Sequence, residues 1–145
     1  MRQDGILVYG QGGGGYNADQ SYWFTLSGSD MKRVEELINQ IREFSRARDW
    51  EQFHSPKNIS MALAAEAGEL LAEFQWLTED ASRSPDEAVL ARIRDEVGDV
   101  FIYLLDLCDH LRIDPIKAAE DKMIKNAGKY PIETARGSAR KYTEL

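Results

Sequence analysis

Residues 64–76 place acidic side chains inside an otherwise apolar run, and this pattern constrains the fold more than any other in the chain. Glu66, Glu69 and Glu73 are spaced i, i+3 and i+7, so a helix of about 3.6 residues per turn would carry them on one face. No lysine or arginine occurs between Met61 and Thr78. Because carboxylates on one face repel each other, the stretch predicts a helix whose acidic face binds a cation.

The stretch from Asp95 to Leu111 repeats the pattern. Glu96, Asp99 and Tyr103 have the same spacing, and lysine and arginine are again absent. Two acidic faces on two apolar helices indicate that the helices pack together and hold a hard cation between them. Oxygen ligands favour magnesium, with manganese as the second choice. A solvated acidic surface without a metal is the alternative interpretation.

Apolar spacing and capping residues predict four long helices and no strand hairpin after residue 30. The expected ranges are residues 29–48, 56–77, 84–111 and 114–128, with Ser84 capping the third helix and a polar connection over residues 78–84. Residues 1–28, with four consecutive glycines, read as a flexible leader in which residues 6–9 and 22–24 form short strands or docking segments. The expected organisation is this leader followed by one all-α domain, residues 29–145.

The overall charge argues against some classes of partner. A net charge of -7 at pH 7 disfavours a nucleic-acid backbone as the main partner. No run of 18 apolar residues predicts a membrane span, and the first residues do not have the pattern of a signal peptide. We therefore predict a cytoplasmic protein whose partner is a small molecule.

Aromatic and basic side chains accompany the acidic faces. Trp50, Trp76 and Tyr103 are either core residues or rings on which a base stacks beside a metal. His54 adjoins the aromatic connection around Trp50, and we predict that it binds the base with them. Lysines on the fourth helix would attract phosphates. Metal, rings and lysines together predict a nucleoside-triphosphate site.

Eight stretches carry a resemblance to a known family: RDWEQFH at residues 48–54, EAGE at 66–69, FQW at 74–76, DEVGDV at 95–100, IYL at 102–104, Lys122-Met123 with Asn126, KYP at 129–131, and RKYTEL at 140–145. Together they resemble the all-α nucleoside-triphosphate pyrophosphatases of the MazG-like superfamily, and within it the dCTP pyrophosphatase branch. The resemblance covers roughly residues 32–145.

The resemblance implies a four-helix bundle that assembles as a homo-oligomer, a tetramer or a dimer. It implies magnesium-dependent hydrolysis of a nucleoside triphosphate to the monophosphate and pyrophosphate, in nucleotide-pool housecleaning. The expected substrate is dCTP or a modified pyrimidine nucleotide, although Ile41 stands where that branch has a base-pocket histidine, so the preferred base stays open. By resemblance, the metal ligands are Glu66, Glu69, Glu96 and Asp99, the base is enclosed by Trp50, Trp76 and Tyr103, and the phosphate side has Lys122, Asn126, Lys129 and Tyr130.

The expected reaction is in-line attack of water on the α-phosphorus. Glu69 is the candidate for orienting or deprotonating this water, with Glu66 as the second catalytic carboxylate. Two other functions stay open at this point. The chain could be a non-catalytic helical interaction module, or a magnesium-dependent hydrolase of another phosphorylated small molecule that needs no stacking rings.

Overall fold

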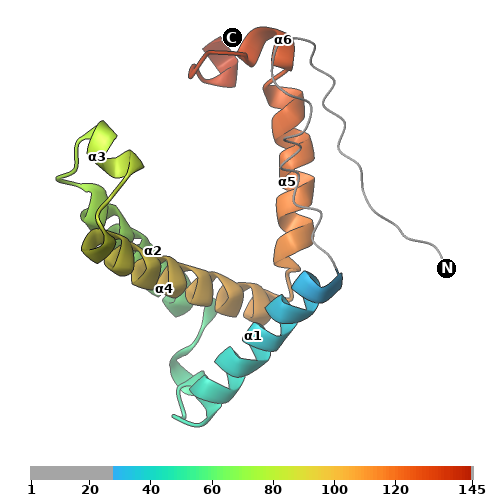
Figure 1. Ribbon diagram of the computed structural model, residues 1–145. Helices are drawn as coiled ribbons and strands as arrows, with labels where there is room; N and C mark the ends of the chain where they lie inside the picture. The colour runs from blue at the N-terminus through green and yellow to red at the C-terminus, as the bar shows by residue number, and fades with distance from the viewer. Residues whose placement is uncertain (1–27, 145) are drawn as a thin grey trace.

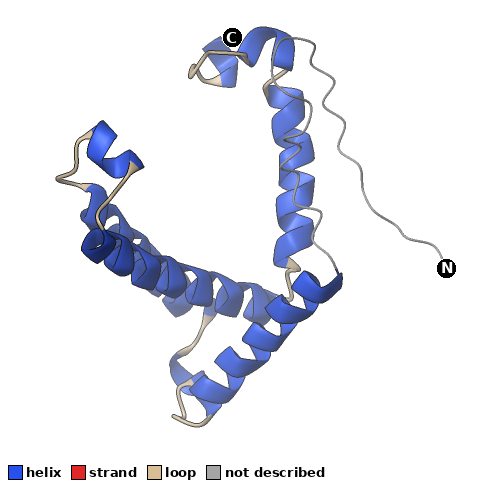
Figure 2. Ribbon diagram, viewed as in Figure 1, coloured by secondary structure: helices blue, strands red, loops and turns tan. Residues whose placement is uncertain are grey.

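The computed structural model describes residues 28–144, and every regular element among them is helical (Figures 1 and 2). The predicted leader and its two short strands fall almost entirely outside the described residues. The four predicted long helices are α1 (Gly28–Arg46), α2 (Pro56–Phe74), α4 (Glu87–Leu111) and α5 (Pro115–Lys129). The all-α class is therefore confirmed.

Short helices occupy the connections. They are η1 (Glu51–Phe53), α3 (Glu79–Arg83), α6 (Ile132–Ala135) and η2 (Tyr142–Glu144). The prediction that residues 78–84 are a plain connection is wrong, because the Thr78 hydroxyl caps α3 by accepting from the Ala81 amide. The helix α2 ends at Phe74, so the predicted end at residue 77 is three residues too late.

Capping side chains set the helix starts. The side chain of Ser55 caps α2, and the side chain of Asp114 accepts from two amides at the start of α5. The prediction that Ser84 caps α4 is wrong by two residues. The Asp86 carboxylate accepts from the Val89 amide at 2.8 Å, and its negative charge also interacts favourably with the N-terminal end of the helix dipole.

The helices α2 and α4 lie side by side along most of their length, and α1 crosses the far end of α4 (Figure 1). The guanidinium of Arg42 on α1 donates to both carboxylate oxygens of Asp109 on α4. This bidentate pair joins α1 to α4. The antiparallel pair of α2 and α4 places the middle of each helix, where the acidic residues lie, opposite the middle of the other.

The four long helices do not close into a bundle within the described chain. Figure 1 shows α5 projecting away from the pair formed by α2 and α4. Only three apolar side chains are buried among the described residues, those of Ile59, Leu105 and Cys108. Many large apolar side chains are exposed, including Val97, Phe101 and Leu104 on α4. Searched along the described residues, no helix is long and apolar enough to span a bilayer.

Candidate active site

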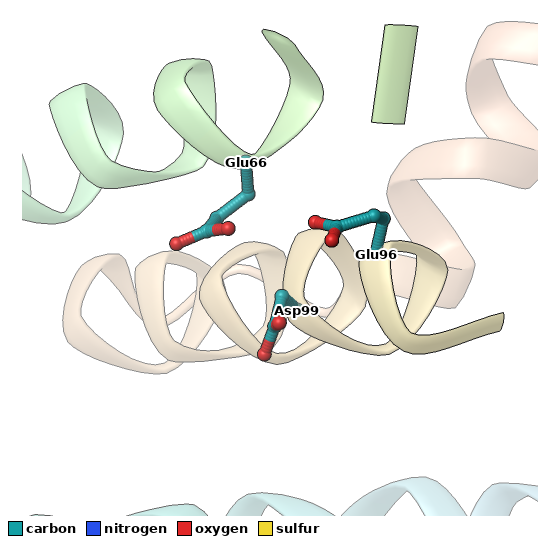
Figure 3. A group of neighbouring side chains, drawn as sticks. All are labelled: Glu66, Glu96 and Asp99. Atoms are coloured by element: carbon teal, nitrogen blue, oxygen red, sulfur yellow. The ribbon is translucent and has the colours of Figure 1, made fainter. Parts of the chain in front are cut away.

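Three carboxylates from the two paired helices lie close together. Glu66 reaches from α2 toward α4, which carries Glu96 and Asp99 (Figure 3). One oxygen of each carboxylate lies within 4.8 Å of the others. Glu69, the fourth predicted ligand, is exposed on α2 one turn beyond Glu66 and is not part of this close group. The helical spacing of the acids therefore produces a three-carboxylate cluster.

Among the described residues, no basic side chain forms an ion pair with the acid cluster. Burial, together with the negative charges of Glu69 and Asp99, raises the pKa of Glu66. Burial raises the pKa of Glu96 as well, and the charges of Glu69, Asp99, Glu66 and Glu73 add to this effect. The Oε2 atom of Glu96 is buried and has no hydrogen-bond partner among the described residues. An ionised carboxylate in this position costs free energy unless a cation accompanies it.

The donor set fits a hard divalent cation. All the donor atoms are carboxylate oxygens, which magnesium and manganese prefer, and neither thiolate nor imidazole belongs to the cluster. The Oε2 atom of Glu96, which is buried and has no hydrogen-bond partner among the described residues, is an oxygen that could bind such an ion. The residues present therefore fit a divalent metal site.

Tyr103 lies next to the acid cluster on α4. Burial raises the pKa of its phenol, and the charges of Glu66, Asp99 and Asp106 raise it further. The phenol therefore stays neutral and can donate a hydrogen bond. The charges of Glu66 and Asp99 thus act directly on Tyr103, which is one of the four predicted base-binding residues.

Trp50 and His54 lie farther along, where α1 ends and α2 begins. The Trp50 ring packs edge-to-face on Phe44 at 5.8 Å between centroids, and its centroid is 6.3 Å from that of the His54 ring. The Nδ1 atom of His54 lies 3.1 Å from Oδ2 of Asp106. A cavity of about 280 Å³ opens here, lined by Arg42, Ser45, Arg46, Glu51, His54, Asp106, Asp109 and His110.

Sequence reasoning missed Asp106. The residue is seven positions after Asp99 and three after Tyr103, so it continues the same face of α4. This spacing is the sequence pattern from which Asp106 could have been predicted as a site residue. Asp106 is buried although it is a carboxylate, and both histidines of the chain approach it.

The other predicted site residues are not brought to the cluster within one chain. Trp76 follows the end of α2 and is 86% exposed, whereas Trp50 precedes the start of this helix, which is about 27 Å long at 1.5 Å per residue. The predicted phosphate-binding residues lie on or just after α5, which projects away (Figure 1): Lys122, Asn126, Lys129 and Tyr130. One chain therefore presents two separate halves of the predicted site.

Comparisons with known proteins agree with one another. The MazG-like family matches residues 61–145. The protein named dCTP pyrophosphatase 1 from Rattus norvegicus is 38% identical over 148 residues, covering 100% of this chain and 85% of the rat protein. Its counterpart from Homo sapiens is 43% identical over 116 residues, covering 77% and 67%. The crystal structure of a pyrophosphatase from Archaeoglobus fulgidus aligns with a TM-score of 0.65 at 42% identity, covering 68% of this chain and 93% of that one.

Proposed function

This chain belongs to the MazG-like family, and we propose that it hydrolyses dCTP or a modified pyrimidine deoxynucleoside triphosphate to the monophosphate and pyrophosphate, using magnesium. It is a nucleoside-triphosphate pyrophosphatase, like the relatives to which it is similar. The observation that supports the metal-dependent reaction is the cluster of Glu66, Glu96 and Asp99 with its buried, unpartnered oxygen. We assign this activity to residues 29–145 and to the cytoplasm.

The three clustered carboxylates would hold the metal. Magnesium, when bound there, supplies positive charge that neutralises the triphosphate oxygens and stabilises the charge that develops at the α-phosphorus. The raised pKa values of Glu66 and Glu96 support this role, because both carboxylates gain most when a cation offsets their mutual repulsion.

Glu69 is our candidate for activating the water. Its carboxylate is exposed, lies one turn from Glu66 on the same helix and acts electrostatically on both Glu66 and Glu96. A carboxylate beside the metal ligands, rather than among them, keeps its lone pairs for a water molecule. Glu69 would therefore orient this water for in-line attack and accept its proton, while Glu66, the second catalytic carboxylate, would hold the metal.

The base would lie toward Tyr103, Trp50 and His54. Asp99 and Asp106 are about 10 Å apart along the α4 axis, with Tyr103 between them. A nucleotide bound along this face can place its phosphates at the acid cluster and its base near the Trp50 ring. Aromatic rings offer stacking faces to any base, so hydrogen-bonding side chains must supply the discrimination between bases.

A second copy of the chain would complete the site. The exposed side chains of Val97, Phe101 and Leu104 are spaced i, i+4 and i+7 and form an apolar stripe on α4. A chain that buries only three apolar side chains among its described residues gains stability by covering such a stripe. We propose a homo-oligomer, a dimer or a tetramer, in which a neighbouring copy supplies Trp76 and the predicted phosphate-binding residues on or just after α5: Lys122, Asn126, Lys129 and Tyr130.

A nucleotide panel tests this function. Purified protein would be incubated with canonical and 5-modified deoxynucleoside triphosphates, with and without magnesium, and the products separated by ion-exchange chromatography. The proposal predicts monophosphate and pyrophosphate in equal amounts, only when magnesium is present, with pyrimidines preferred. Diphosphate with orthophosphate would mean that a different bond is cut. A folded protein that converts no nucleotide would contradict the proposal.

A further inference from the structure

Asp106 is a buried carboxylate that the acid cluster does not include. It is 5% exposed, and both histidines of the chain face it. The Nδ1 atom of His54 lies 3.1 Å from Oδ2, and the Nδ1 atom of His110 lies 3.3 Å from Oδ1. One carboxylate is therefore shared by two imidazoles, one from α4 itself and one from the segment before α2.

The proton position on His110 is fixed by the backbone. Its Nδ1 atom lies 3.0 Å from the carbonyl oxygen of Asp106, one turn earlier in α4. A carbonyl oxygen only accepts hydrogen bonds, so Nδ1 of His110 must carry a proton. This requirement does not depend on the side chain at position 106.

The proton position on His54 depends on the side chain of Asp106. The Nδ1 atom of His54 is buried and makes no aligned hydrogen bond among the described residues, so the carboxylate 3.1 Å away is the group that decides its state. A lone pair on Nδ1 would face a negative charge in a buried setting, whereas an N–H there is attracted to it. The neutral imidazole therefore carries its proton on Nδ1 and keeps a lone pair on Nε2.

We propose that Asp106 is a positioning residue that fixes this tautomer of His54, so that Nε2 accepts a hydrogen bond from the exocyclic amino group of a cytosine-type base. The inference rests on the proposed function and names the specificity element within it. An acceptor at Nε2 attracts the amino group of cytosine and repels the carbonyl oxygen that uracil and thymine carry at the same position.

An aromatic ring and a cavity lined by polar side chains adjoin His54. The Trp50 ring lies beside it, and Ser45, Glu51 and Asp106 line the same cavity of about 280 Å³. The cavity lies on the face of α4 that continues from Asp99 through Tyr103 to Asp106.

The substitution Asp106→Asn tests the tautomer directly. The amide keeps the size of the carboxylate but has one acceptor and one donor. Because His110 always presents an N–H, the amide oxygen turns toward His110 and the NH₂ group toward His54. His54 must then present a lone pair on Nδ1 and carry its proton on Nε2. Nitrogen-15 NMR of histidine-labelled full-length protein reports both rings, and His110 serves as an internal control that does not change.

The kinetic readout is the preference for dCTP over dUTP. In Asp106→Asn we expect the ratio of the two kcat/KM values to fall by roughly tenfold, mainly through a higher KM for dCTP, because a base contact present in both ground and transition states is lost. The matched control is Glu87→Gln, which removes a carboxylate charge from the exposed start of the same helix, outside the cavity, and should leave the ratio unchanged. If Asp106→Asn does not fold, His54→Phe removes the same acceptor and should give the same loss of preference.

Three results would overturn the inference. They are a wild-type spectrum with the His54 proton on Nε2, an unchanged dCTP preference in a folded Asp106→Asn variant, and the same loss of preference in Glu87→Gln. A wild-type protein that hydrolyses neither nucleotide would overturn the proposed function instead, and the NMR spectra would still report the tautomer.

Discussion

The Nε atom of Arg92 on α4 lies 2.8 Å from Oε2 of Glu73 on α2, and this ion pair links the two helices at the end of the acidic face. Glu73 shares its helix face with Glu66, yet its charge is already balanced. Glu66 and Glu96 have no such cationic partner in the described part of the chain, and their pKa values are raised. The acidic face of α2 thus carries Glu73, whose charge is paired, and Glu66, whose charge has no such partner among the described residues.

Glu73→Gln should weaken the fold slightly. The substitution removes the charge of a pair whose side chains are 20% and 55% exposed, so we expect a loss of about 0.5–1 kcal/mol in the free energy of unfolding. Urea denaturation followed by circular dichroism measures this difference. Arg92→Gln removes the same pair and should lose a similar amount. A loss confined to one of the two variants would show that the pair is not the cause.

Glu96→Gln should stabilise the metal-free protein. The raised pKa of Glu96 means that the folded state holds this proton more tightly than the unfolded state does. The stabilisation from this proton is therefore fully present below the ordinary glutamate pKa of 4.5 and is lost as pH rises through the folded pKa. Glutamine removes that loss. In EDTA we expect the variant to melt a few degrees higher than wild type near pH 8 and at nearly the same temperature near pH 4. A lower melting temperature at both pH values would contradict the raised pKa.

Asp109→Asn should weaken the contact between α1 and α4. The hydrogen bond from Arg42 holds the pKa of Asp109 below its ordinary value, so the stabilisation is present above the unfolded pKa and is lost as pH falls through the folded pKa. Because the Arg42 side chain is 48% exposed, we expect a loss of only about 1 kcal/mol at neutral pH, which shrinks in acid. Urea titrations at several pH values measure it.

The control for Asp109 is Asp121→Asn. Asp121 pairs with Lys117 within α5, four residues apart and on an exposed surface. Such exposed ion pairs contribute little to stability. The free energy of unfolding of the Asp121→Asn variant should therefore differ from that of wild type by less than about 0.5 kcal/mol. Equal losses in the two variants would mean that the Arg42 pair has no special role in attaching α1.

Mixed oligomers test whether Trp50 and Trp76 of different chains serve one site. Each Trp→Ala substitution alone should lower kcat/KM by roughly 10- to 100-fold, because base stacking is lost. If the two variants are unfolded together and refolded as dimers, half of the dimers contain one of each chain, and one site in each of these is intact. We expect about a quarter of the wild-type activity to return. Mixtures no more active than the separate variants would place each site within one chain.

The helices could be predicted largely because their signals are local. A capping side chain followed by proline, as at Ser55 and Asp114, fixes a helix start without help from distant residues. The start of α4 was misplaced because Ser84 and Asp86 both suit a cap, and only the structure shows which one accepts from an amide. A five-residue helix such as α3 is too short to produce a periodic pattern.

The acid cluster follows from helical periodicity, but its details do not. Three residues along α2 rotate a side chain by about 60° away from Glu66, so Glu69 lies outside the close group although it shares the face. The partnership of His54 with Asp106 joins residues 52 positions apart in the sequence. Such a contact depends on how α2 packs against α4, which residue spacing alone does not specify.

The most direct test of the central claim is the magnesium dependence of pyrophosphate release in Glu66→Gln compared with Glu73→Gln. The two variants carry the same substitution on the same face of α2, but only Glu66 belongs to the carboxylate cluster. We predict that Glu66→Gln lowers kcat/KM by at least about 100-fold, whereas Glu73→Gln stays within about threefold of wild type with an unchanged magnesium requirement. A folded Glu66→Gln variant with normal magnesium-dependent rates would contradict the assignment of the metal site.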